Sequence, residues 1–333
     1  MKKFTGLLII VLMLFACSNE KREADISGIE LEVKIGRFDI DFWNLDTLDI
    51  PSELLRLEKK YPELLPIYLE RIVEFGKVTD TITASTILSF YKDTAVINLY
   101  TDELAAFADV SDIEAKLTDA FKRARYFFPD KATPQFCLHV SGLNQSLVVG
   151  ENFISLSADN YLGSDYSLYK RVMIYNYLRP NMCREKIVSD YVTAFLVSEF
   201  PFVSQQRQLL DEMIYRGKIM YVQSLLLPNE PERLLMGYTP EQWAWAEKYE
   251  KEVWLTMLGK QHLFSHDPML VVQYLNDAPF TTPISQESPG RLGVYIGWQI
   301  VEDYMKRERN VTPAELMKDF DYRKIFQKSG YKP

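Results

Sequence analysis

The chain changes character at Gly163, and this change constrains its fold more than any other feature of the sequence. Before Gly163, short apolar runs are separated by Gly142 and Gly150, a pattern that predicts the strands of a small antiparallel sheet near residues 136–140, 146–149 and 153–156. After Gly163, apolar residues recur at helical spacing almost without a break. This predicts helices near 165–178, 184–199, 204–227, 240–259, 267–276, 289–307 and 313–319. We therefore expect an α+β fold, in which a small antiparallel sheet is followed by a mainly helical half.

Several helix starts are marked by capping sequences. Thr239 and Thr312 are each followed by proline and, three residues after the threonine, by Gln or Glu. This order of residues is typical of a capping box. Ser111 and Glu114 have the same spacing and predict a helix that runs to about Phe127.

Strand periodicity is present nearer the N-terminus. Apolar and polar residues alternate over residues 29–35 and again over 38–42, after Gly36. Asp39 and Asp41 would share one face of the second strand. We expect this pair of carboxylates to belong to a solvated or salt-bridged surface.

The N-terminus has the features of an export signal. Met1-Lys2-Lys3 precedes an apolar run over residues 7–15, and Ala16-Cys17 follows. A secretory signal has a positive start, about 7–15 apolar residues and a small residue before the cleavage site. The run is too short for a membrane span, which needs about 20 apolar residues. A cysteine directly after a small residue resembles the bacterial lipobox, so we expect a signal peptide over 1–16, a lipid on Cys17 and a tether over 17–28. The alternative is an ordinary signal peptide with an incidental cysteine.

Residues 29–333 are expected to form a single globular domain, because no Gly/Ser-rich linker or repeat interrupts them. The content of 47% hydrophobic and 25% charged residues is ordinary for a globular protein. The 38 Lys+Arg against 46 Asp+Glu give a net charge of −8, and no basic run occurs. This balance argues against a nucleic-acid partner, since phosphate binding needs clustered Lys and Arg.

Two cysteines remain after Cys17. An exported Cys137 and Cys183 could form a disulfide, but their separation in sequence does not fix the geometry, so the pairing stays open. Cys137 belongs to a predicted strand and is interpreted as a small buried hydrophobe. His139 would share its strand face, yet nothing else around this pair indicates a nucleophile.

The sequence offers few residues for a metal site or a hydrolytic active site. A zinc peptidase site needs His-Glu-x-x-His, and the chain has three histidines and no His-Glu dipeptide. His262 and His266 have i,i+4 spacing, but Asp267-Pro268 follows at once and places His266 in a turn. No nucleophile elbow and no Gly-rich phosphate loop occur in the sequence. We expect no catalytic residues, no metal site and no cofactor.

Five segments carry a likeness to a known family: residues 126–129, 157–163, 209–218, 289–301 and 326–333. They resemble the gliding-motility lipoprotein family GldB of Bacteroidota, and the strongest match is Pro-Gly-Arg-Leu-Gly-Val-Tyr-Ile-Gly-Trp-Gln-Ile-Val at 289–301. The resemblance implies a lipoprotein of the cell envelope in the context of gliding and type IX secretion.

The resemblance also implies a distant relation to zincin-like peptidases, which share a Gly-Tyr-x-Ile-Gly-like helix and an earlier Glu-Gly motif. Arg216-Gly217 stands at the earlier motif, so a cation replaces a carboxylate ligand. The expected fold is therefore degenerate zincin-like, and the chain would be a pseudo-peptidase. Seven residues are candidates for a remaining groove or interaction surface: Asp159, Tyr161, Tyr175, Tyr177, Arg179, Lys218 and Tyr295.

The helix near 290–307 is expected to be a packed core element and not a lipid-facing span. It is amphipathic, and Gly293 and Gly297 lie four residues apart, where they would let a neighbouring helix approach closely.

We therefore expect a non-catalytic lipoprotein that is anchored in the envelope, on the periplasmic face or in the outer membrane, through Cys17. It would act through contacts with envelope proteins of the motility or secretion machinery. The alternative is a peptidase-like hydrolase with an unrecognised active site, and the small inventory of ligand residues favours the first interpretation.

Overall fold

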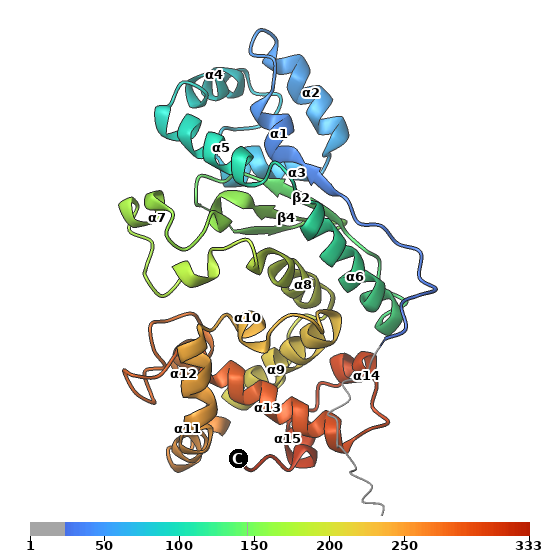
Figure 1. Cartoon of the computed structure of the whole chain (residues 1–333), viewed down its shortest axis with the longest axis vertical. Coiled ribbons are helices and arrows are strands. Elements are labelled where there is room, and N and C mark those ends of the chain that lie inside the picture. The colour runs from blue at the N-terminus through green and yellow to red at the C-terminus, as the bar shows by residue number, and fades with distance from the viewer. Residues whose placement is uncertain (1–23, 145) are drawn as a thin grey trace, which may run out of the picture.

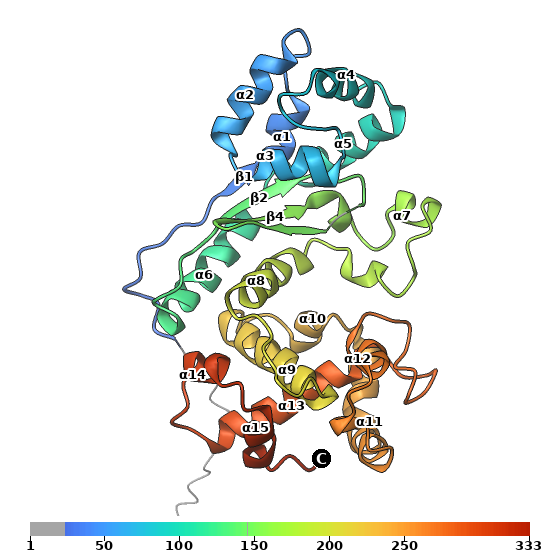
Figure 2. The same cartoon turned by 180° about the vertical axis from the view of Figure 1, so that it is seen from behind.

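The computed structural model describes residues 24–144 and 146–333, and these form three tiers (Figure 1). Helices α1–α5 lie on one side of a small sheet, and α6 and α8 lie on the other. The helices from α9 to α15 make up the third tier, which Figure 2 shows from behind. The arrangement confirms the expected α+β class. Cys17 and the signal peptide lie outside the described residues.

The first tier covers the sheet with short helices. These are α1 (Phe38–Trp43), α2 (Ile50–Lys60), α3 (Leu64–Ile67), the π-helical turn η1 (Tyr68–Ile72), α4 (Thr81–Phe90) and α5 (Thr94–Ala106). The strand expected over 38–42 is wrong, because these residues form α1. Phe38 and Phe42 are four residues apart, so on a helix they share one face, where both are fully buried with ring centroids 5.7 Å apart.

The sheet has the order β1-β2-β4-β3, with β1 (Ile35–Arg37), β2 (Gln135–His139), β3 (Leu147–Val149) and β4 (Phe153–Ser157). Strands β1, β2 and β4 run parallel, and only β3 is antiparallel to its neighbour β4. The expectation of an antiparallel sheet is therefore wrong. Gly142 and Gly150 separate the three runs in sequence, but β3 pairs on the outer edge of β4, so β2 and β4 meet directly and in parallel.

The two faces of the sheet are buried against different helices. Phe136 and Leu138 of β2 belong to the core shared with α6 (Ser111–Phe127) and α8 (Lys186–Glu199). Cys137, one residue along, packs on the opposite face with the N-terminal helices. The carboxyl ends of three parallel strands consequently meet between two helical layers.

The remaining elements are mainly helical. They are the 3-10 turn η2 (Ala158–Tyr161), α7 (Ser167–Arg171), the turn η3 (Arg179–Asn181), α9 (Leu209–Leu226), α10 (Glu232–Met236), α11 (Pro240–Gly259), the turn η4 (His262–Phe264), α12 (Pro268–Leu275), α13 (Leu292–Arg307), α14 (Pro313–Lys318) and α15 (Tyr322–Ser329). The single helix expected over 165–178 is wrong, since only α7 forms there and irregular chain follows it.

Two of the three expected capping boxes form. The side chains of Thr239 and Thr312 accept hydrogen bonds from the backbone N–H of the third residue of α11 and α14. The side chain of that third residue accepts a hydrogen bond from the backbone N–H of the threonine. Helix α6 does begin at Ser111, but its residue Val110 at the N-cap makes no side-chain cap. The Glu114 carboxylate accepts a hydrogen bond from the Ile35 N–H at 2.9 Å instead, because β1 lies against this helix.

Helix α13 is a packed element, as expected. Its Gly297 and the Gly217 of α9 lie where the two helices cross, and a Cβ on either glycine would overlap the backbone of the other helix. None of the helices within the described ranges is both long and apolar enough to cross a membrane.

Candidate functional site in the α7 loop

Five of the seven candidate residues lie in or at the base of one projecting segment. This segment, the α7 loop, comprises residues 162–183 between η2 and α8, and it stands out from the body of the molecule in both views (Figures 1 and 2). Tyr175, Tyr177 and Arg179 belong to the loop, while Asp159 and Tyr161 in η2 directly precede it. The loop therefore groups three of the seven candidates, and two more, Asp159 and Tyr161, are buried at its base.

Asp159 fixes the base of the loop to the carboxyl ends of the strands. Its carboxylate accepts hydrogen bonds from the backbone N–H groups of Ser141 (3.1 Å) and Leu143 (2.7 Å), and from the hydroxyl of Ser157. The side chain is fully buried, and burial raises the pKa of Asp159 although these hydrogen bonds favour its charged form. Asp159 is thus a structural anchor of η2 and makes no contact with solvent.

Tyrosine hydroxyls close the base of the loop. Tyr169 of α7 donates to the Asp159 carbonyl at 2.7 Å and accepts from the Leu162 N–H at 2.9 Å. Tyr161 donates to Asp190 of α8 at 2.8 Å. The Gly163 N–H bonds the Met182 carbonyl at 2.9 Å, which joins the two ends of the loop as in a compact surface loop.

Arg179 braces the outer part of the loop from within. Its guanidinium donates to the Ile174 carbonyl at 3.0 Å and to the side-chain oxygen of Asn176. The rings of Tyr175 and Tyr177 stack with centroids 5.4 Å apart and planes 14° from parallel. These contacts hold the segment 174–179 in one conformation without the support of a regular element.

The tip of the loop exposes large apolar side chains. Met173 is 82% exposed, Tyr175 66% and Val172 49%, and Lys170 and Arg171 directly precede them. Met173 also has a φ of 60°, in the left-handed region that bulky residues rarely adopt. The left-handed backbone of a bulky residue is strained, and the exposed side chain gains no stability from burial, so Met173 points to a role outside the stability of the fold.

A group of buried charged residues lies at the carboxyl end of β1. Arg37, which ends β1, forms a salt bridge of 2.6 Å with Asp39 and donates to the Phe107 carbonyl at 2.7 Å. Glu103 of α5 is fully buried, and neither of its oxygens accepts a hydrogen bond from a described residue. Burial raises the pKa of Glu103 to about 9, and repulsion from Asp39 adds to the rise. Glu103 is therefore protonated at neutral pH and can donate to Asp39.

The pair Asp39 and Asp41 is consequently split by the helix that they occupy. Asp41 remains at the surface in a salt bridge of 2.5 Å with Lys60, as expected for a surface carboxylate. Asp39 is salt-bridged as well, but it is fully buried, which strand alternation did not suggest.

His139 and Ser155 face each other across β2 and β4. The His139 Nδ1 lies 2.8 Å from the Ser155 Oγ, within the reach of a nucleophile and its base. Both side chains are fully buried, however, and burial lowers the pKa of His139 to about 3. The imidazole stays neutral at physiological pH, and no substrate can reach the pair in this conformation.

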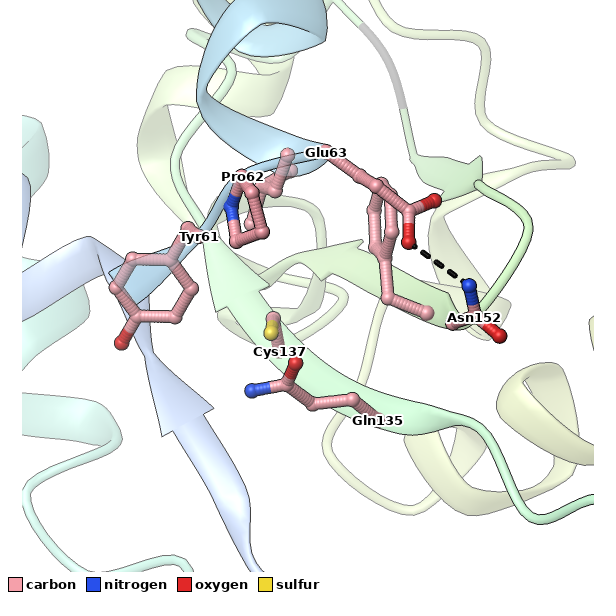
Figure 3. A pocket seen from close by; sticks show the side chains of 8 residues that line it. Tyr61, Pro62, Glu63, Gln135, Cys137 and Asn152 are labelled. Carbon is pink, nitrogen blue, oxygen red and sulfur yellow. Dashed lines mark hydrogen bonds between the residues drawn. The ribbon is translucent and has the colours of Figure 1, made fainter. Parts of the chain in front are cut away.

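Cys137 lies at the wall of a cavity of about 40 Å³ (Figure 3). The cavity is bounded by Tyr61, Gln135 and the Glu63 carboxylate, which accepts a hydrogen bond of 3.1 Å from Asn152. Burial raises the pKa of the Cys137 thiol to about 12, so it is neither a thiolate nor a ready nucleophile. Cys137 and Cys183 are both free thiols, so the disulfide left open by the sequence does not form in this structure.

Lys218 and Tyr295 lie elsewhere and do not join the α7 loop. Lys218 is 1% exposed and donates to the carbonyls of Met317 (3.2 Å) and Asp319 (2.9 Å), where it caps the end of α14. Tyr295 is buried in α13 and donates to Glu250 of α11 at 3.2 Å. These two side chains stabilise the packing of the third tier.

His262 and His266 are not arranged together as metal ligands. His262 begins the turn η4 and contacts the Tyr274 hydroxyl at 3.0 Å, whereas His266 lies in the following irregular segment. Among residues 24–144 and 146–333, no group of three or more His, Cys, Asp or Glu side chains is arranged to hold a metal ion.

Comparison with protein families matches residues 19–333 to the family described as gliding motility protein GldB. The chain belongs to the GldB family. No curated protein and no solved structure matches the chain. The match confirms the family resemblance of the sequence, while the relation of GldB to zincin-like peptidases stays a prediction.

Two of the GldB-like segments meet in space. Residues 209–218 and 289–301 supply the halves of α9 and α13 that cross at Gly217 and Gly297. The glycine of the Arg216-Gly217 motif is thus required for close packing of the helices. Arg216 itself donates to the Leu275 carbonyl at 3.0 Å, a contact that holds α12 against α9.

Sequence reasoning missed Glu103 in this GldB chain. One signal could have found it: Tyr100, Glu103 and Phe107 recur at i, i+3 and i+7, so a carboxylate interrupts an apolar stripe. A charged residue in that position is buried with its stripe and must be neutralised or paired.

Proposed function

We propose that this chain is a lipid-anchored, non-catalytic component of the gliding or type IX secretion machinery, and that it works through contacts with other envelope proteins. Membership of the GldB family supports the association with gliding. The sequence features around Cys17 support the anchor, and the family match begins just after that cysteine, at residue 19.

The observation that carries the non-catalytic part is the burial of the reactive side chains. His139, Glu103 and Cys137 are each at most 1% exposed. A general acid or base must come within hydrogen-bond reach of its substrate. A buried imidazole whose pKa is near 3 and a thiol whose pKa is near 12 are poorly matched to acid–base or nucleophilic work at neutral pH.

A test compares anchoring with motility in a gliding host that lacks its own GldB. The wild-type chain is expected to restore spreading of colonies and to fractionate with membranes. Cys17→Ala should fail to restore spreading at equal protein level and should lose its membrane association or its processing. A Cys183→Ala variant is the matched control, because Cys183 is partly exposed and forms no disulfide within the described residues.

Spreading restored by a Cys17→Ala chain that no longer binds membranes would show that the anchor is dispensable. The peptidase-like alternative would be favoured if the purified wild-type chain had a hydrolytic activity and a chelator abolished it.

A further inference from the structure

We infer that the tip of the α7 loop is a docking surface for an acidic envelope protein. The inference rests on the proposed function, because it names the surface through which the anchored chain would make its contacts. The apolar side chains of Val172, Met173 and Tyr175 form its centre, and Lys170 and Arg171 form its basic rim.

The arrangement is that of a small protein interface. Energetically important residues cluster at the centre of an interface and are surrounded by polar groups. Met173 and Tyr175 are large, flat or adaptable side chains of the kinds enriched at such centres. Their high exposure leaves apolar surface in water, and burial against a partner would remove that surface from water with a gain in free energy.

The loop is ordered before any partner binds. Arg179 holds the Ile174 carbonyl and the Asn176 side chain, and the Gly163–Met182 hydrogen bond closes the base. The left-handed backbone of Met173 is maintained by this frame and directs an apolar side chain outward. A surface held in its binding conformation avoids the entropy cost of ordering a flexible loop.

Charge decides the chemistry of the partner. Residues 162–183 contain Lys170, Arg171 and Arg179 against Asp165 alone, so the loop is basic in a chain whose net charge is −8. Lys170 lies 3.8 Å from Asp165, a carboxylate that is 95% exposed. Arg171 has no salt bridge with any residue in the described part of the chain. Both cations are therefore available to pair with carboxylates of a partner.

The position of the loop favours a protein over a membrane surface. The first described residues run along α6, where the Val33 N–H bonds Thr118 and Arg125 bonds the Glu30 carbonyl. In Figures 1 and 2 this segment leads toward α14 at one side of the molecule, and the α7 loop projects from the opposite side. A chain held by its N-terminus thus carries the loop away from the anchored side.

A second copy of the chain is the less suitable occupant. In a two-fold dimer the same patch faces itself, so two basic rims would oppose each other and repel.

Photo-crosslinking in the full-length anchored chain tests the inference. Met173→p-benzoylphenylalanine is expressed in the gliding host that lacks its own GldB, and Leu48→p-benzoylphenylalanine is the control, because Leu48 is 93% exposed on the N-terminal tier. Position 173 is expected to crosslink one protein through a peptide rich in Asp and Glu, identified by mass spectrometry. Position 48 should give no such product.

Charge reversal supplies the second arm. Lys170→Glu with Arg171→Glu should lower the yield of the crosslink by about tenfold, which corresponds to about 1.4 kcal/mol. Lys77→Glu with Lys92→Glu makes the same change of charge at exposed positions of the first tier and should leave the yield unchanged. Thermal unfolding of each variant confirms that the fold is intact.

A crosslink to lipid, a crosslink to a second copy of the chain, or a yield unaffected by charge reversal at 170 and 171 would overturn the inference. The proposed function fails separately. If the chain with reversed charges stays membrane-bound and restores full spreading, the docking surface is wrong and the anchored role stands. If Cys17→Ala without membrane association restores spreading, the anchored role itself is wrong.

Discussion

Replacing Gly297 by alanine should force α9 and α13 apart at their crossing. A Cβ built on Gly297 would lie under 3.0 Å from the carbonyl carbon and oxygen of Met213, and 3.2 Å from the Met213 Cα. Ordinary contact of a Cβ begins near 3.4 Å, so the helix backbones must separate by more than an ångström. Backbone cannot rotate away as a side chain can.

The size of the effect follows from overpacking. Extra methyl groups in a packed core cost about 1–3 kcal/mol, and we expect the upper end because the clash is with backbone. The higher helix propensity of alanine returns at most about 1 kcal/mol. A net loss near 2 kcal/mol in a chain of this length lowers the Tm by roughly 3 °C. Gly297→Leu should lower it further.

Differential scanning calorimetry of purified chains measures this shift, with Gly259→Ala as the matched control. Gly259 also lies in a helix, α11, but no atom lies within 4 Å of a Cβ built there. Its Tm should stay the same or rise slightly. An unchanged Tm for Gly297→Ala, or equal losses for the two variants, would refute the packing of α9 against α13.

Two further predictions concern the buried carboxyls. Glu103 has a pKa of about 9 in the folded state, whereas its pKa in the unfolded chain is about 4.5. The stability that Glu103 contributes is therefore complete below pH 4.5 and is lost as the pH rises toward 9. Glu103→Gln, which can still donate to Asp39, should therefore be more stable than wild type by a few kcal/mol at pH 8.5 and by much less at pH 5 in urea denaturation. A difference in stability that does not depend on pH would contradict the raised pKa of Glu103. Asp159→Ala leaves the backbone N–H groups of Ser141 and Leu143 without their carboxylate and should cost about 2–4 kcal/mol, while Asp159→Asn should cost less; protease cleavage within the α7 loop that is no faster in the alanine variant would contradict its role as the anchor.

Local signals predicted the parts of the fold that local forces decide. Thr239 and Thr312 with their prolines contain the whole of a capping box, and both boxes form. The spacing of Gly293 and Gly297 likewise indicated close packing of α13, and the crossing at Gly217 and Gly297 confirms it.

Two of the wrong predictions share a physical cause, which is competition from contacts that no local pattern encodes. Glu114 had the spacing of a capping box, but the β1 backbone at Ile35 takes its carboxylate. The segment after Gly163 had helical spacing, yet Tyr169 donates to the Asp159 carbonyl of η2 and Arg179 donates to the Ile174 carbonyl of the loop. Such partners lie far away in sequence or depend on loop geometry, so no periodicity can reveal them.

The sequence could predict only part of the candidate site, for the same reason. Tyr175, Tyr177 and Arg179 are neighbours in sequence, so a family-like segment could suggest them together. Lys218 was suggested beside them, but it lies far away and caps α14. Parallel pairing of β2 with β4, which places Asp159 and His139 near one sheet edge, depends on β3 occupying the outer position.

In the proposed function the chain acts through its surface and its anchor, and not through chemistry at its buried polar groups. Restoration of spreading by His139→Asn, Glu103→Gln and Cys137→Ala tests it most directly, in a gliding host without its own GldB and with protein levels and Tm measured for each variant. Every stably folded variant is expected to restore spreading as the wild-type chain does. Loss of spreading in a variant with wild-type protein level, Tm and membrane association would contradict a non-catalytic role and identify that side chain as a functional group.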